Sequence, residues 1–362
     1  MLYRKYRPHD FSQVVGQEHV VTTLKGALMT GRAGHAYLFS GPKGTGKTTI
    51  ARIFAKALNC ADFSKIFSKN LTISIPCNKC PACLAVNENR SLDLIEIDAA
   101  SNRGIEDIRN LKESALVAAP GGGYKIFIID EVHMLTKDAF NALLKILEEP
   151  PAHVVFILAT TEAHKIPPTV LSRVQKFDFK RLNPGQVFEK LNRVADKEKI
   201  RISAEGLRAI ALSCDGALRD AEVALSKIQA ATPPGRAVSV DEVNEILGLI
   251  PSNYFRDFFS FLANGDKPAA IGLIHEVYNA GIDPEHFTKN FIEYLRKLLL
   301  GKVSPAVLAA SGEEIDAPPP VNVAGQQLVR MLNIFSFAKT EIKTSPVPQL
   351  PLELAVMELI PE

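Results

Sequence analysis

The sequence predicts an α/β fold in which helices cover both faces of a parallel sheet, followed by two helical domains. Short continuous apolar runs alternate with helix-spaced apolar residues up to about residue 180, as expected of buried parallel strands and their crossover helices. A glycine-rich loop joins the first strand to its helix, and the later pattern is helical. We therefore expect domains over residues 1–180, 181–236 and 237–362, with a Pro-Pro-Gly linker at 233–235.

Composition limits the classes of function. The 362 residues carry a formal net charge of +2, which argues against a generally basic coat for nucleic acid and leaves any DNA contact to a local patch. No apolar run is long enough to span a bilayer, and the first residues lack the apolar stretch of a signal peptide. We expect a soluble, cytoplasmic chain without membrane contact.

The glycine-rich loop fits the phosphate-binding template G-x-x-x-x-G-K-[ST]. An apolar strand precedes it and an apolar helical stretch follows it, in the order that the template needs. Glycines let backbone N–H groups turn toward phosphate oxygens, and the helix N-terminus adds positive potential. Lys47 is expected to reach the β- and γ-phosphates, and the Thr48 hydroxyl to bind Mg²⁺. The alternative is a chance glycine-rich turn. The loop consists of Gly41, Pro42, Lys43, Gly44, Thr45, Gly46, Lys47 and Thr48.

A second apolar run, residues 125–131, ends in Asp130 and Glu131. It predicts a buried parallel strand that delivers two carboxylates to the C-terminal edge of the sheet. We expect Asp130 to support Mg²⁺ and Glu131 to orient or deprotonate the attacking water. The alternative is a strand end with two solvated acids. A third run ends in Thr160 and Thr161, whose hydroxyls would lie where a γ-phosphate has to be sensed.

Four cysteines follow the pattern C-x16-C-x2-C-x2-C at Cys60, Cys77, Cys80 and Cys83. Four thiolates from a helix end and a tight knuckle suit tetrahedral Zn²⁺ with a closed first shell, which predicts a structural zinc in an insert over residues 60–83. Buried free cysteines or a redox-active pair are the alternatives.

Two further sites are open to more than one interpretation. Ser101 and Asn102 are good N-cap residues before a helix expected from about Ile105, and with Arg103 this helix N-terminus would hold a DNA phosphate. Ordinary capping explains the same residues equally well. Arg173 has no evident partner in the sequence, and one interpretation is an arginine finger for the nucleotide of a neighbouring subunit.

Taken together, these residues resemble the AAA+ ATPases, and within them the gamma/tau subunits of the bacterial DNA polymerase III clamp loader. The resemblance runs from about Leu2 to the end of the sequence. The four-cysteine insert is its most discriminating part, because most AAA+ proteins lack it. Loaders commonly carry Ser-Arg-Cys where this chain has Ser172-Arg173-Val174. The other segments that carry the resemblance are 4–8, 14–19, 41–49, 129–135, 144–151 and 216–220.

The resemblance implies roles for matching residues. Lys47, Thr48 and Thr49 would belong to the Walker A motif, and Asp130 and Glu131 would be the Walker B acids. Arg173 would act in trans on the ATP of the adjacent subunit. The remaining implied nucleotide contacts are Thr161 as first sensor, Arg219 as second sensor, and Arg7 and Val15 beside the adenine.

The resemblance also implies a function, namely ATP-driven loading of a sliding clamp onto primed DNA. Implied partners are the other loader subunits in a hetero-oligomeric, pentameric ring, the clamp, primer–template DNA and, through any longer tail, the DNA polymerase III core. The chain would be an ATPase within a polymerase holoenzyme, not its polymerising subunit. A helicase-type AAA+ motor and a non-hydrolysing scaffold subunit are the alternatives.

The last part of the sequence is expected to be an all-α domain, which in the resembling family is the collar that oligomerises the loader. Seven of its phenylalanines are expected in the core. They are Phe255, Phe258, Phe259, Phe287, Phe291, Phe335 and Phe337.

Overall fold

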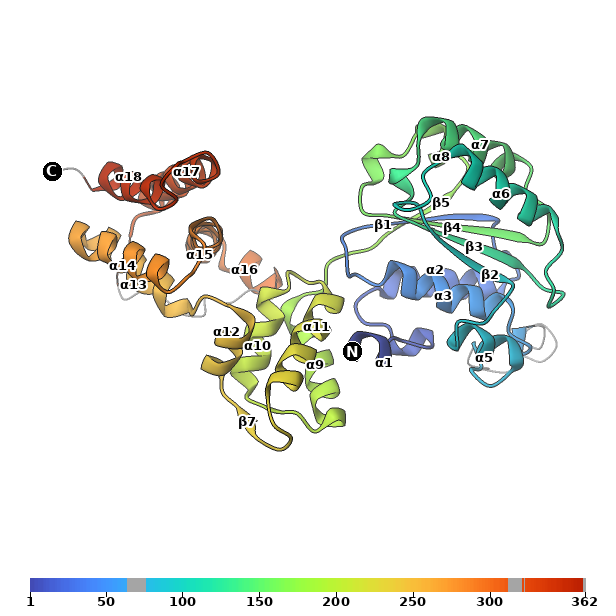
Figure 1. The fold of residues 1–362 in the computed structure, drawn as a ribbon, viewed down its shortest axis with the longest axis horizontal. Helices are drawn as coiled ribbons and strands as arrows, with labels where there is room; N and C mark the ends of the chain where they lie inside the picture. Colours follow the sequence, from blue (N-terminus) through green and yellow to red (C-terminus); the bar gives the residue numbers. More distant parts are fainter. Residues whose placement is uncertain (64–75, 312–320, 322, 361–362) are drawn as a thin grey trace. The chain divides into compact units, whose positions relative to one another are not determined.

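The computed structural model describes residues 1–63, 76–311, 321 and 323–360 (Figure 1). The chain divides into two compact units. The first holds residues 1–182, 189–194 and 214–226, and the second holds residues 183–188, 195–213 and the chain from 227 on. Helices α9 and α11 contribute to both units. The predicted division into three domains stays a prediction.

The first unit is built on a sheet of five parallel strands in the order β2-β3-β4-β1-β5. Strand β4 lies between β1, which leads into the glycine-rich loop, and β3, which ends in the acids. The carboxyl ends of these three strands therefore meet at one edge of the sheet. The strands are β1 Ala36–Ser40, β2 Leu94–Asp98, β3 Lys125–Asp130, β4 Val154–Thr160 and β5 Gln175–Asp178.

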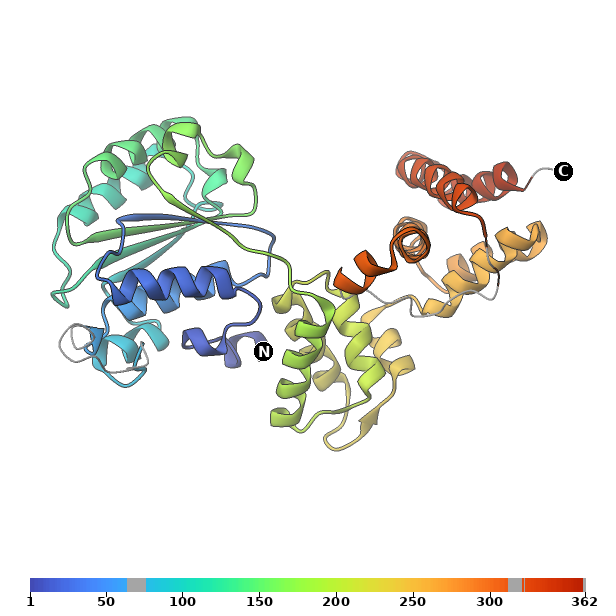
Figure 2. The same ribbon diagram turned by 180° about the vertical axis from the view of Figure 1, so that it is seen from behind.

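Helices cover both faces of this sheet. Helices α2 and α3 lie on one face and α6, α7 and α8 on the other, and Figure 2 shows the same two layers from behind. Successive strand residues enter opposite cores: Tyr37 packs with the α2–α3 layer and Leu38 with the α6–α7 layer. The helices of this part are α1 Leu2–Lys5, α2 Glu18–Met29, α3 Lys47–Leu58, α5 Pro81–Asn87, α6 Ile105–Leu116, α7 Lys137–Glu148 and α8 Pro168–Leu171. Single 3₁₀ turns form at Phe11–Gln13, Val132–Met134 and Ala163–Lys165.

The later chain is helical, as expected. Short strands β6 Arg201–Ile202 and β7 Ala237–Val238 pair in parallel. The helices are α9 Pro184–Glu198, α10 Ala204–Ser213, α11 Leu218–Ala231, α12 Val240–Leu247, α13 Ser252–Asn264, α14 Lys267–Asn279, α15 Pro284–Val303, α16 Pro305–Ser311, α17 Gly325–Ile342 and α18 Leu350–Leu359. Among the described helices, none has the length and apolar content needed to cross a membrane.

The core of the second unit is aromatic. The ring of Phe258 lies 4.8 Å from that of Phe291 and 5.7 Å from that of Phe335 (centroid distances), and all three are buried. Six of the seven phenylalanines predicted for this core are in it. The prediction for Phe337 is wrong, since it is 67% exposed. Phe335 and Phe337 are two residues apart on α17, which turns their side chains to opposite faces.

Candidate functional site

A cavity of about 660 Å³ in the first unit brings most of the predicted nucleotide residues together. Its volume lies in the usual range for small-molecule sites, roughly 300–1,000 Å³. The glycine-rich loop and α3 form one side, and the N-terminal arm, residues 3–15, forms a second. The end of α5, strands β2 and β3 and the start of α11 form the rest. The predicted residues that line it are Arg7, Val15, Lys43, Gly44, Thr45, Gly46, Lys47, Thr48, Thr49, Asp130, Glu131 and Arg219.

The backbone conformation of the glycine-rich loop explains why glycine is needed at two of its positions. Gly41 has φ +148°, and a Cβ there would lie 2.4 Å from the Phe179 carbonyl oxygen. Gly46 has φ +98° at the N-cap of α3. A side chain at either position would be strained, because L residues with a Cβ avoid positive φ.

Lys47 is buried within this loop, at 6% exposure. Its Nζ donates to the carbonyl oxygens of Gly41 at 2.8 Å and Pro42 at 2.9 Å. An ammonium has three N–H donors, so one remains available for an anion in the cavity. Burial lowers the pKa of Lys47, while the charges of Glu131 and Asp130 act in the opposite direction.

Thr48 and Asp130 meet as the sequence predicts. The Thr48 hydroxyl, at the start of α3, donates to Asp130 Oδ2 at 2.8 Å, at the end of β3. Mg²⁺ prefers oxygen ligands, and the Thr48 hydroxyl and the Asp130 carboxylate place two of them side by side. These two residues fit a magnesium site.

Glu131 has an unusual backbone conformation, and its side chain is hydrogen-bonded. Its backbone is left-handed, with φ 48°, an uncommon conformation for a residue other than glycine. Its Oε2 accepts hydrogen bonds from the Thr161 hydroxyl at 3.0 Å and the Thr161 amide at 3.3 Å. The predicted catalytic carboxylate, Glu131, and the predicted first sensor, Thr161, are therefore in direct contact.

Sequence reasoning missed His133. Its side chain is 7% exposed, its Nδ1 lies 3.0 Å from the Thr160 hydroxyl, and its Nε2 lies 3.1 Å from Glu162 Oε2. The ring joins the ends of β3 and β4 beside Glu131. The only signal in the sequence was a histidine three positions after Asp130.

The two predicted arginines that line the cavity, Arg7 and Arg219, have partners from other segments of the chain. The Arg219 guanidinium lies 4.9 Å above the ring of Tyr3, a cation–π contact that ties α11 to α1. Arg7 Nε donates to the Thr49 hydroxyl at 3.2 Å, which attaches the N-terminal arm to α3. Tyr3 was not predicted.

Arg173 lies apart from the predicted residues that line the cavity. Its Nη2 lies 2.7 Å from Glu148 Oε1, and its Nη1 donates to the Thr169 carbonyl at 2.7 Å. The sequence showed no evident partner for Arg173, and the structure supplies one, because Glu148 at the end of α7 lies beside it. Its role as an arginine finger stays a prediction.

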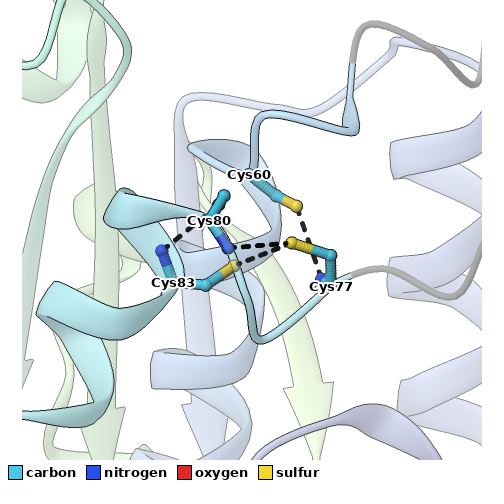
Figure 3. A group of neighbouring side chains, drawn as sticks. All are labelled: Cys60, Cys77, Cys80 and Cys83. Carbon is cyan, nitrogen blue, oxygen red and sulfur yellow. Dashed lines mark hydrogen bonds between the residues drawn. The ribbon is translucent and has the colours of Figure 1, made fainter.

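The four predicted zinc ligands converge (Figure 3). All four Sγ atoms lie within 4.8 Å of one another, with Cys60 following α3 and Cys80 and Cys83 at the start of α5. Four sulfurs in tetrahedral contact with zinc at about 2.3 Å would lie about 3.8 Å apart, so the cluster fits the ion. Residues 64–75 of the predicted insert lie outside the described residues. The hydrogen bond between the Cys60 and Cys83 thiols lowers the pKa of Cys60 and raises the pKa of Cys83.

The residues predicted to bind DNA form a turn after β2. Ser101 and Asn102 donate their backbone amides to the Asp98 carbonyl at 3.1 and 3.0 Å. The N-cap of α6 is Gly104, whose amide donates to Asp107 Oδ2 at 3.0 Å, so capping by Ser101 and Asn102, one of the two interpretations of these residues, is wrong. Arg103 is exposed, and DNA binding here stays a prediction.

Known families match both ends of the chain. Residues 16–183 match the DNA polymerase III delta subunit family, and residues 238–361 match domain III of the DNA polymerase III gamma and tau subunits. The chain is 39% identical over 362 residues to the DNA polymerase III subunit tau of Bacillus subtilis, covering 99% of this chain and 62% of that protein. The tau subunit of Escherichia coli is 40% identical over 308 residues, covering 85% of this chain and 46% of that protein.

The chain belongs to the gamma/tau family of DNA polymerase III subunits. The predicted family and the predicted fold class are thereby confirmed. A third gamma/tau relative, from Mycobacterium tuberculosis, is 36% identical over 370 residues, covering 99% of this chain and 62% of that protein. The chain therefore spans about half to three fifths of the length of these gamma/tau relatives.

Two solved structures are similar at a lower level. The RuvB Holliday junction branch migration motor of Thermotoga maritima has a TM-score of 0.49 and 18% identity, covering 71% of this chain and 79% of that chain. The DNA clamp loader delta protein of Bacillus subtilis has a TM-score of 0.40 and 13% identity, covering 94% of this chain and 99% of that chain. Neither likeness is close enough to carry an argument about function.

Proposed function

We propose that this chain is the ATP-hydrolysing motor subunit of a clamp loader, which loads a sliding clamp onto primed DNA. The observation that carries the proposal is the meeting of Lys47, Thr48, Asp130 and Glu131 around one cavity, in a chain of the gamma/tau family. A scaffold subunit without hydrolysis would have no need of all four side chains.

Each side chain has a distinct task in this proposal. The glycine-rich loop and Lys47 bind the triphosphate, with the loop amides and the ammonium facing its negative charge. Thr48 and Asp130 hold Mg²⁺, which when bound neutralises phosphate charge. Glu131, oriented by Thr161, takes a proton from the attacking water. Arg7 and Val15 flank the base.

Assembly completes the site. Arg173 lies apart from the cavity of its own chain, which supports a role on the nucleotide of the next subunit. The partners proposed are the other loader subunits in a pentameric ring, the sliding clamp, primer–template DNA near Arg103 and, through a longer tail, the DNA polymerase III core. Zinc at the four cysteines is structural, and the chain works in the cytoplasm as an ATPase without polymerising chemistry of its own.

The test uses the reconstituted loader with clamp and primed DNA. Lys47→Ala should abolish both ATP binding by this chain and ATP-dependent clamp loading, because it removes the ammonium that faces the triphosphate. Clamp loading by the Lys47→Ala complex at the wild-type rate would contradict the motor role and favour the scaffold alternative.

A further inference from the structure

Lys56 is a buried cation on α3 with no part in the proposed chemistry. It is 2% exposed and lies nine positions beyond Lys47 on the same helix. A buried lysine destabilises a protein unless its ammonium is fully hydrogen-bonded. Its partners therefore show what the residue holds together.

Three oxygens surround the ammonium. Lys56 Nζ donates to the His9 carbonyl at 2.6 Å, to Asn78 Oδ1 at 2.6 Å and to Asn87 Oδ1 at 2.7 Å. The three N–H donors of the ammonium are thus matched by three acceptors. The acceptors come from the N-terminal arm, from the loop between Cys77 and Cys80, and from the end of α5.

Two of these acceptors belong to the cysteine knuckle, residues 77–87. Asn78 stands between two of the cysteines with φ 57°, and Asn87 ends the helix that carries Cys83. Asn87 Oδ1 also lies 3.2 Å from His9 Nδ1, so the knuckle touches the arm directly as well as through Lys56.

The arm and the knuckle are both walls of the nucleotide cavity. His9 and Asn87 line it, together with Arg7, whose guanidinium bonds to Thr49. A second link runs in parallel, since Arg52, also on α3, bonds to Asn89 just after α5. The base side of the cavity is thus built by segments that meet at α3.

We propose that Lys56 is a positioning residue that couples the zinc-bound knuckle to the nucleotide site. The knuckle fixes the two asparagine oxygens, these fix the ammonium, and the ammonium holds the arm at His9, so that Arg7 is in place before ATP binds. This inference rests on the proposed ATP and zinc sites. Disturbing the knuckle should therefore weaken ATP binding although the glycine-rich loop is intact.

The sharpest variant is Asn78→Gly. Asn78 is outside the residues that line the cavity, and glycine tolerates its positive φ, so the change removes one acceptor of Lys56 and leaves the cysteines in place. Loss of a hydrogen bond to a charged group should weaken binding of a fluorescent ATP analogue to the full chain about tenfold. Zinc content, measured in the same samples, should stay at the wild-type value.

Lys56→Met and Lys125→Met form a matched pair. Lys125 is also buried, at 6% exposure, and its Nζ donates at 2.6 Å to the Ser114 carbonyl of α6, a helix none of whose residues lines the cavity. Both variants should lower the melting temperature, and only Lys56→Met should weaken ATP binding. In the Lys56→Met background, Asn78→Gly should cause no further loss, because the two changes break one link.

The outcomes separate this inference from the proposed function. Wild-type affinity for the ATP analogue in folded Asn78→Gly would overturn the coupling, and so would independent, multiplying losses in the double variant. If Lys56→Met fails to fold, the Asn78→Gly result decides alone. Failure of the wild-type chain to bind ATP would instead contradict the proposed function.

Discussion

The carboxylate of Glu131 receives two hydrogen bonds from Thr161, and its backbone adopts a left-handed conformation. Both features restrict where the carboxylate can point. A fixed carboxylate suits a general base, because a general base has to lie within hydrogen-bond distance of the water from which it takes a proton. Thr161 is therefore expected to act through Glu131 in addition to any contact with phosphate.

Thr161→Val tests this coupling, since valine keeps the shape of threonine and removes its hydroxyl. Loss of one hydrogen bond to a carboxylate should slow ATP hydrolysis by the assembled complex about tenfold to a hundredfold. ATP affinity should change little, because Lys47 and the loop are untouched. Both quantities are measurable on one preparation, and wild-type turnover would rule out the orienting role.

Glu222 gives a second prediction at this scale. It is 5% exposed, its Oε1 has no hydrogen-bond partner among the described residues, and burial raises its pKa to about 7. A carboxyl whose pKa is raised by folding binds more protons in the folded state, so its ionisation destabilises the fold as pH rises from about 4.5 to about 7.

Glu222→Gln should remove this pH dependence. At pH 8 the variant should be more stable than wild type by about 3 kcal/mol, the free energy that corresponds to raising the carboxyl pKa from about 4.5 to about 7. At pH 4 the two should be nearly equal, because the wild-type carboxyl is then protonated in both states. Urea unfolding at the two pH values measures the difference, and an equal gain at both would exclude ionisation as the cause.

At the scale of elements, two phenylalanine substitutions test which side chains form the core of the second unit. One is at Phe258 on α13 and the other at Phe337 on α17. Phe258→Ala removes a fully buried ring and should lower the free energy of unfolding by about 3–5 kcal/mol. Phe337→Ala removes a ring that is 67% exposed and should change it by about 0.5 kcal/mol or less. Denaturant unfolding compares the two, and equal losses would contradict the assignment of the core.

The sequence predicted the elements whose signals are local. The glycine-rich loop and the acid-ended strand β3 carry their chemistry within a few residues, and the four cysteines are recognised by their spacing over residues 60–83. What it missed depends on contacts between distant segments. Glu148 beside Arg173 and Thr161 on Glu131 result from the packing of α7 and the order of the strands. Ser101 and Asn102 do not cap α6 because that helix begins at Ile105 with Gly104 as its N-cap, and both residues lie in the turn before it.

At the scale of the molecule, the cavity holds the residues proposed to bind the triphosphate and to activate water, while Arg173 is paired with Glu148. A site divided in this way would hydrolyse ATP slowly in a single chain and faster in a ring, where the arginine of one subunit meets the nucleotide of the next. Hydrolysis would then depend on assembly, clamp and DNA, as a loader requires.

The most direct test is the rate of ATP hydrolysis by this chain alone, compared with its rate in the reconstituted complex with the other loader subunits, clamp and primed DNA. We expect slow hydrolysis alone and strong stimulation in the full mixture, and we expect Arg173→Ala to remove the stimulation while ATP binding stays intact. Rapid hydrolysis by the chain alone, with no stimulation by any added component, would contradict the clamp-loader function.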